Sequence, residues 1–168
     1  MRWAVAGLAA LAVGACATTQ NDGFASGQLR DASGGRHGDV FARPEGGRIR
    51  IDVRANNITP GTYGIHVHAV GRCDGPDFDS AGGHWNPTAR RHGRDNPAGM
   101  HSGDLPNLIV GAERRATLSF MIDGSYSGAD NSLLDVNGAS IVIHTAADDY
   151  RTDPSGQSGA RMICAVLR

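Results

Sequence analysis

Apolar and charged residues alternate strictly between residues 48 and 54. Ile49, Ile51 and Val53 are separated by arginine or aspartate, so an extended segment here has one apolar and one charged face. This period of two is typical of a half-buried antiparallel strand. Residues 118–122 repeat the pattern. The alternation therefore predicts strands that each cover one side of a core.

Shorter signals extend this picture along the chain. The pattern becomes strand-like from about Phe24, a strand over 39–43 turns back at residues 45–47, and short apolar runs lie at 141–143 and 163–167. No segment of helical length shows a capped amphipathic pattern. Several short strands separated by turns predict an all-β fold, either a β-sandwich or a barrel.

Residues 71–106 break this pattern. The segment has no strand signal, and it contains three histidines, several aspartates and many glycines and prolines. A stretch of this length without regular structure inside a compact domain is usually functional. A bound metal ion would order it.

Six of the seven histidines have a spacing that suits a metal site, namely His66, His68, His84, His92, His101 and His144. His66 and His68 lie two residues apart on a predicted strand, so both imidazoles project from one face and can reach one ion. A pair of surface histidines would give the same short pattern, and His92 or His101 alone would be an ordinary loop residue. The case for a metal rests on the complete set, since imidazole is a common ligand of transition metals.

Composition narrows the choice of function. The 168 residues predict one domain, and the 24 glycines favour turns over long helices. A formal net charge of −1 gives no reason to expect nucleic acid as a partner. All 16 basic residues are arginine. Any side-chain cation that attracts an anion here must therefore be an arginine.

The first residues resemble an export signal. Arg2 supplies a positive charge, and residues 3–13 form an apolar run too short to span a bilayer. Residues 13–16 (VGAC) resemble a bacterial lipobox, in which Cys16 becomes the lipidated first residue of the mature protein. Cleavage at an ordinary small-residue site, residues 15–17 (ACA), is the alternative. We predict a lipid anchor at Cys16 and a location in the periplasm or cell envelope.

The three cysteines support this interpretation. Three is an odd number for an exported protein, and lipidation of Cys16 leaves Cys73 and Cys164 as one pair. An oxidising compartment allows that pair to form a disulfide. We therefore predict a lipoprotein-type signal peptide over 1–15, a flexible tether over 16–24 and one domain over 25–168.

Seven segments resemble, in order and spacing, the copper/zinc superoxide dismutases, in particular their exported bacterial branch. They are residues 64–68 (GIHVH), 82–87 (GGHWNP), 91–93 (RHG), 101–108 (HSGDLPNL), 140–144 (SIVIH), 148–150 (DDY) and 159–164 (GARMIC). The resemblance covers the chain from about residue 26 to its end. It implies a Greek-key β-sandwich or flattened barrel with long metal-binding loops. It also implies an enzyme that converts superoxide to oxygen and hydrogen peroxide with copper and zinc.

The same resemblance implies roles for single residues. The copper ligands would be His66, His68, His84 and His144. The zinc ligands would be His84, His92, His101 and Asp104, so that His84 bridges the metals. Asp148 would link His66 to His92 from outside the ligand set. His84 and Arg161 would be catalytic, with Arg161 holding the superoxide anion beside copper, and Cys73 and Cys164 would be disulfide-bonded.

Three features depart from the usual family pattern. Ala69 follows His68 where an acidic or polar residue is usual, Trp85 follows His84 where a smaller ring is usual, and no lysine is present. These departures put the attraction of superoxide in doubt, and they leave the ligand set complete. Two alternatives remain open: an envelope protein that binds copper and zinc without catalysis, and a structural domain with incidental histidines. The sequence also leaves a homodimer open.

Overall fold

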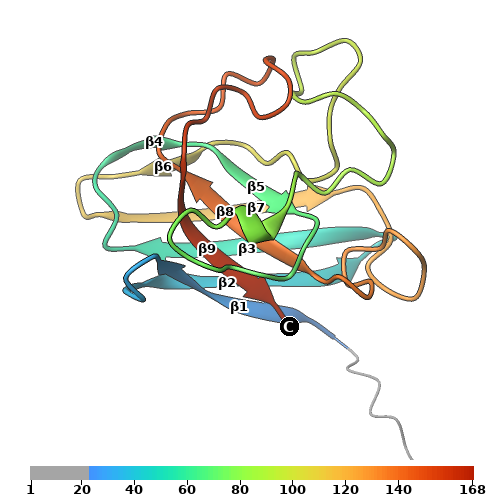
Figure 1. The fold of residues 1–168 in the computed structure, drawn as a ribbon, viewed down its shortest axis with the longest axis horizontal. Coiled ribbons are helices and arrows are strands. Elements are labelled where there is room, and N and C mark those ends of the chain that lie inside the picture. Colours follow the sequence, from blue (N-terminus) through green and yellow to red (C-terminus); the bar gives the residue numbers. More distant parts are fainter. Residues whose placement is uncertain (1–22) are drawn as a thin grey trace, which may run out of the picture.

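A computed structural model describes residues 23–168, so the predicted signal peptide and the lipidation site at Cys16 lie outside the described residues. The described elements are β1 (Ala25–Asp31), β2 (Arg36–Glu45), β3 (Arg48–Asn56), β4 (Gly61–Tyr63), β5 (Ile65–His68), the 3-10 turn η1 (Asp79–Ala81), β6 (Leu108–Val110), β7 (Arg115–Ile122), β8 (Ala139–His144) and β9 (Arg161–Leu167) (Figure 1). Within residues 23–168 no helix is long and apolar enough to cross a membrane. The all-β prediction is confirmed.

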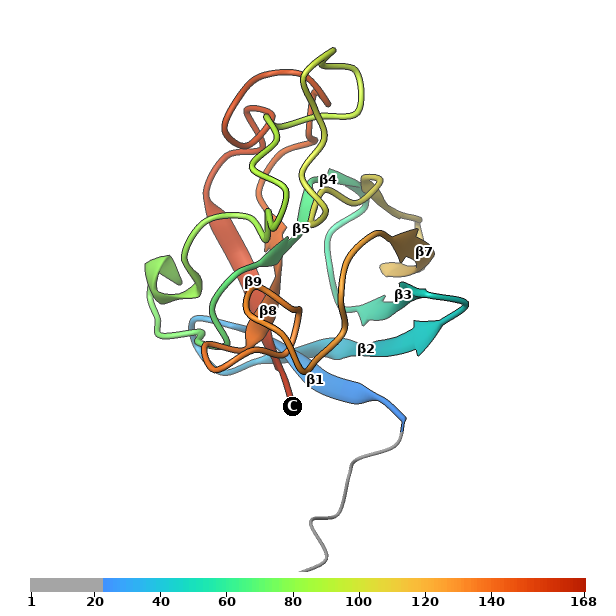
Figure 2. The same ribbon diagram turned by 90° about the vertical axis from the view of Figure 1, so that its right-hand side faces the viewer.

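Seven strands form one antiparallel sheet in the order β5-β8-β9-β1-β2-β3-β7, and β4 pairs with β6. Figure 2 shows the sheet curling, so that β5, β8 and β9 lie opposite β3 and β7, with β1 and β2 between them. β3 pairs with β7 and not with β4, which follows it in sequence. These crossings make the curled Greek-key architecture that the sequence resemblance implies.

The interior of the curl is filled by alternate residues of the strands. Ile49, Ile51 and Val53 of β3 are at most 1% exposed, as their period-two spacing predicts. Trp85 is also buried, and its indole Nε1 donates to the carbonyl of Asn131 at 3.1 Å. A side chain at Gly124 would overlap the Trp85 ring, so the glycine makes room for the unusually large residue after His84.

The sequence pattern did not reveal β4 and β6, which have three residues each. Ile109 in the middle of β6 is 73% exposed, while Leu108 and Val110 on either side are buried. Burial alternates along β6, but the exposed residue is itself apolar, so the sequence shows an uninterrupted apolar run. A strand of three residues is too short for periodicity to detect.

Two long loops lie together at one end of the sheet, residues 86–107 and 145–160, in both views of the molecule (Figures 1 and 2). The backbone N–H of Asp95 donates to the carbonyl of Tyr150 at 3.0 Å. The backbone N–H of His92 donates to Asp153 Oδ1 at 2.6 Å. These bonds join the loops above the strands that carry the remaining histidines.

Candidate metal centre

Paired strands bring four histidines to one point. His66 and His68 lie on β5, and His144 ends the neighbouring strand β8. An isolated bridge between His68 and His84 adds a histidine from the segment that follows β5. We call His66, His68, His84 and His144 the histidine group. One donor atom of each lies within 4.8 Å of the others.

Three of these rings have hydrogen-bond acceptors on their outer side. His66 Nε2 bonds to the Asp148 carboxylate at 2.8 Å, His68 Nδ1 to the Gly82 carbonyl at 2.9 Å, and His144 Nδ1 to the Gly159 carbonyl at 3.2 Å. Because an oxygen of this kind only accepts, the outer nitrogen carries the ring proton. The inner nitrogens are His66 Nδ1 and the Nε2 atoms of His68, His84 and His144. They are buried and have no hydrogen-bond partner among the described residues.

Burial also sets the charge of these rings. It lowers the pKa of His66 to about 3, of His68 to about 2 and of His144 to about 4. The three imidazoles are therefore neutral at neutral pH, which is the form that binds a metal. Neutral rings with inward lone pairs and no partner fit a copper ion.

A second set of donors surrounds Asp104. Its Oδ1 lies 2.8 Å from His84 Nδ1 and 3.1 Å from Nδ1 of both His92 and His101. Its Oδ2 accepts from the backbone N–H groups of Gly93 and His101, which fixes the carboxylate. We call His84, His92, His101 and Asp104 the aspartate group. Three imidazole nitrogens and one carboxylate oxygen are a donor set that zinc accepts.

His84 belongs to both groups, because its Nδ1 faces Asp104 and its Nε2 lies in the histidine group. A donor atom of His66 also lies within 4.8 Å of the donors of His84, His92 and Asp104. However, His66 uses Nε2 for Asp148, and its Nδ1 belongs to the histidine group. His101 Nδ1 contacts Asp104 directly, so we assign His101 to the aspartate group.

Asp148 is buried between the two groups and contacts both. Its Oδ2 accepts from His66, and its Oδ1 lies 3.0 Å from His92 Nε2. Burial opposes ionisation, but hydrogen bonds from His66 and His92 hold the pKa of Asp148 below its usual range. Burial also opposes a charged His92, yet the carboxylates of Asp104 and Asp148 raise the pKa of His92 to about 9. A Cβ at Gly156, where φ is 65°, would overlap the Asp148 carboxylate, so this position requires glycine.

Asn107 is a site residue to which the sequence analysis gave no role. Its side chain accepts from the backbone N–H of Asp148 at 2.8 Å and donates to the Asp148 carbonyl at 2.9 Å. Its own backbone N–H donates to the Tyr150 hydroxyl at 2.7 Å. Asn107 thus clamps the backbone of the carboxylate that joins the two groups. The sequence offered one hint of this role, which is that Asn107 lies only three residues after the predicted metal ligand Asp104.

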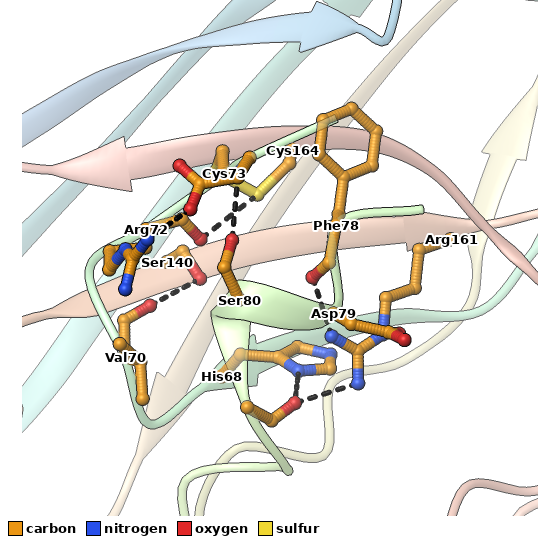
Figure 3. The surroundings of a disulfide bond; sticks show 12 residues. His68, Val70, Arg72, Cys73, Phe78, Asp79, Ser80, Ser140, Arg161 and Cys164 are labelled. Atoms are coloured by element: carbon orange, nitrogen blue, oxygen red, sulfur yellow. Dashed lines mark hydrogen bonds and ion pairs between the residues drawn. A yellow bond between two sulfur atoms is a disulfide. The ribbon is translucent and has the colours of Figure 1, made fainter. Parts of the chain in front are cut away.

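Arg161 starts β9 and is held against the loop that precedes His84. Its guanidinium donates to the carbonyl oxygens of Phe78 at 2.6 Å and Gly82 at 2.7 Å (Figure 3). The Gly82 oxygen also accepts from His68, so one carbonyl positions both the arginine and a member of the histidine group. Arg161 is half-buried, and its remaining N–H groups can bind an anion.

The predicted disulfide between Cys73 and Cys164 is present and ties this same loop to β9 (Figure 3). The two cysteines are 91 residues apart in sequence. Closing a loop of that length stabilises a fold by roughly 4–5 kcal/mol in the chain-entropy model. The bond holds the Phe78 and Gly82 carbonyls in place beside Arg161.

A cavity of about 670 Å³ connects this site to solvent. His68, His84 and His144 of the histidine group line it together with Arg161. The loop residues Asp77 and Asp79 line it as well. A small anion therefore has a path to the guanidinium and to the cavity-facing edges of these three rings, beneath which the inner nitrogens lie.

Comparison with known proteins gives one consistent result. The family model described as copper/zinc superoxide dismutase (SODC) matches residues 36–167. The superoxide dismutase-like protein YojM of Bacillus subtilis is 44% identical over 122 residues, which are 71% of this chain and 62% of that protein. Superoxide dismutase [Cu-Zn] 1 of Aquifex aeolicus is 40% identical over 124 residues, 71% of this chain and 73% of that protein.

A solved structure shows the same similarity in three dimensions. The structure of a SOD-like protein from Bacillus subtilis matches with a TM-score of 0.80 at 40% identity, covering 85% of this chain and 97% of that one. The likeness of fold therefore covers most of this chain, and the family model spans residues 36–167, which contain every member of both groups.

Proposed function

Because this chain belongs to the copper/zinc superoxide dismutase family, we propose that it converts superoxide to oxygen and hydrogen peroxide. We assign copper to the histidine group and zinc to the aspartate group, with His84 shared between them. In the overall reaction, two superoxide anions and two protons give one oxygen molecule and one hydrogen peroxide molecule. The matched region is less than two thirds of the Bacillus relative, which is named a superoxide dismutase-like protein.

One observation carries the proposal. Four inner imidazole nitrogens are buried without a partner, and they converge beneath a cavity that Arg161 also lines. Leaving four buried acceptors unsatisfied is costly in a folded protein unless a ligand binds them. A structural domain with incidental histidines would have no reason to arrange them in this way.

Each residue has a chemical task in this proposal. Copper would supply a one-electron redox couple when bound, and zinc a fixed charge without redox chemistry. His84 can hold a proton at Nε2 and release it, since that nitrogen has no other partner among the described residues. Arg161 orients the anion through its planar donors. Asp148 keeps the rings of His66 and His92 in a fixed orientation.

Solvent access distinguishes the enzyme from a protein that only stores metal. A storage site gains from being closed, whereas this cavity reaches His68, His84 and His144 directly. Arg161 at its wall serves an anionic substrate and has no use in holding a cation. Both features favour catalysis over metal storage.

The proposal is tested by loading the purified domain with copper and zinc. We expect about one ion of each per chain by elemental analysis, and rapid superoxide removal in an assay that is insensitive to free copper. Arg161→Ala should lower kcat/KM several-fold with metals retained, because the guanidinium attracts the anion and such attraction can raise capture about 10- to 1000-fold. Arg151→Ala, an exposed arginine outside the cavity lining, is the matched control. Full metal content without dismutation would support the storage alternative.

We also propose that the protein works in the periplasm or cell envelope, anchored through Cys16. The lipobox-like pattern at 13–16 and the disulfide Cys73–Cys164 support this, since disulfides persist in oxidising compartments. Wild-type protein should fractionate with membranes, and Cys16→Ser should release it or block its processing. Soluble wild-type protein with a mature start after Ala17 would overturn the anchor.

A further inference from the structure

Three charged side chains line the cavity above the histidine group, namely Arg161, Asp77 and Asp79. We propose that Asp77 and Asp79 act as an electrostatic brake, which lowers the affinity of this site for monovalent anions and the rate at which superoxide is captured. The proposal rests on the proposed function and concerns the substrate path of that same site.

The positions of these carboxylates support the proposal. Asp77 and Asp79 are exposed and flank the buried Phe78, whose carbonyl accepts from Arg161. Figure 3 shows the Asp79 side chain beside the Arg161 side chain. Both carboxylates lie on the loop that the disulfide joins to β9, and this bond limits how far the loop can move from the cavity.

The balance of formal charge among these residues is unusual for a site that captures an anion. One arginine and two aspartates give a formal charge of −1 at the cavity wall. The metal ions would add positive charge at its base, offset in part by the carboxylates of Asp104 and Asp148. An incoming anion therefore meets two like charges in the same cavity that leads to Arg161 and the metals.

Coulomb's law sets the size of the effect. A unit charge about 10 Å away in water changes the local concentration of a monovalent anion roughly twofold at low salt. Neutralising both carboxylates should therefore raise capture about fourfold. The gain should vanish at about 1 M salt, where the screening length is only about 3 Å.

Azide binding to the copper(II)-loaded protein tests this without relying on turnover. Azide is a small monovalent anion, and its binding to copper changes the visible absorption. We expect Asp77→Asn combined with Asp79→Asn to lower the azide Kd about fourfold at low salt and to steepen its salt dependence. Asp79→Lys changes the wall charge by the same two units at a single position, so it should lower the Kd by a similar factor. kcat/KM for superoxide should rise in parallel.

The control is Asp74→Asn, which removes one carboxylate charge from the same loop outside the cavity lining, and it is compared with Asp79→Asn alone. Its azide Kd should equal that of wild type. The brake is disproved if the double variant binds azide as wild type does, if its gain persists at about 1 M salt, or if Asp74→Asn gives the same gain. Azide results as expected in a protein without dismutase activity would uphold the brake and reject the proposed function.

Discussion

The two metal-binding groups share His84 but rest on different parts of the fold. His66, His68 and His144 lie on β5 and β8, paired strands of the main sheet. His92, His101 and Asp104 all lie in the long loop 86–107. Formation of the sheet therefore places three members of the histidine group. The position of the aspartate group depends instead on contacts within and between loops.

The two groups also differ in charge. Burial lowers the pKa of His66, His68 and His144, so those rings are neutral without metal. In the aspartate group, Asp104 together with Asp148 raises the pKa of His92 to about 9 against the effect of burial. A proton on His92 thus partly replaces the metal in the metal-free protein. The comparison indicates that the proposed copper site is preformed, whereas the proposed zinc site needs a cation to be stable.

The largest effect on activity should come from the strand-held group. His144→Ala removes one inner nitrogen while leaving the loop contacts in place. We expect activity below about one hundredth of wild type, because even the loss of an outer partner costs about 10- to 100-fold. Zinc content and the melting temperature should change little. Dismutase activity equal to wild type at full copper loading would refute the assignment of the histidine group.

The largest effect on stability should come from the loop-held group. Asp104→Ala removes the oxygen around which His84, His92 and His101 gather. Zinc present at about 1,000 times its Kd contributes about 4 kcal/mol to apparent stability, and the variant should lose that contribution. Thermal unfolding with and without zinc measures the loss. If zinc raised the melting temperature of the variant as much as that of wild type, the loop residues would not form the zinc site.

Sequence reasoning was most reliable where side-chain spacing is set by the backbone itself. The period of two placed Ile49, Ile51 and Val53 in the core and set His66 and His68 on a strand. No such rule connects residues across two irregular loops. The clamp of Asn107 on Asp148 depends on how those loops fold together, and the acidic wall of the cavity depends on how the loop with Asp77 and Asp79 packs beside Arg161. They therefore required the structure.

The two groups should change the stability of the metal-free protein in opposite directions as pH rises. His66, His68 and His144 have lowered pKa values, so their contribution is present above pH 6.5 and is lost as pH falls toward 4. His92 has a raised pKa, so its contribution is present below pH 6.5 and is lost as pH rises through about 9. Urea unfolding of the metal-free, disulfide-intact protein should show a maximum near pH 6.5.

A variant can show which histidines cause the loss of stability on each side of the maximum. Asp104→Asn removes one of the two carboxylates that raise the pKa of His92, so it should flatten the loss above pH 6.5. The loss below pH 6.5 should remain, because it belongs to the strand-held histidines. Stability that rises steadily between pH 6.5 and 9 would contradict the charge assigned to His92.

The smallest effects concern Asp148, which connects the groups without belonging to either. Asp148→Asn keeps the shape but removes the charge that His66 and His92 both face. Gly156→Ala leaves the carboxylate intact but inserts a Cβ where it lies. Both variants should weaken zinc binding about 10- to 100-fold, the usual cost of losing an outer partner. Competition with a chelator measures this loss.

The charge variant, Asp148→Asn, should also lower the pKa of His92 in the metal-free protein, as NMR titration would show. If the position of the carboxylate matters more than its charge, Gly156→Ala will be the more damaging of the two. Zinc affinity equal to wild type in both variants would show that the two groups are held independently.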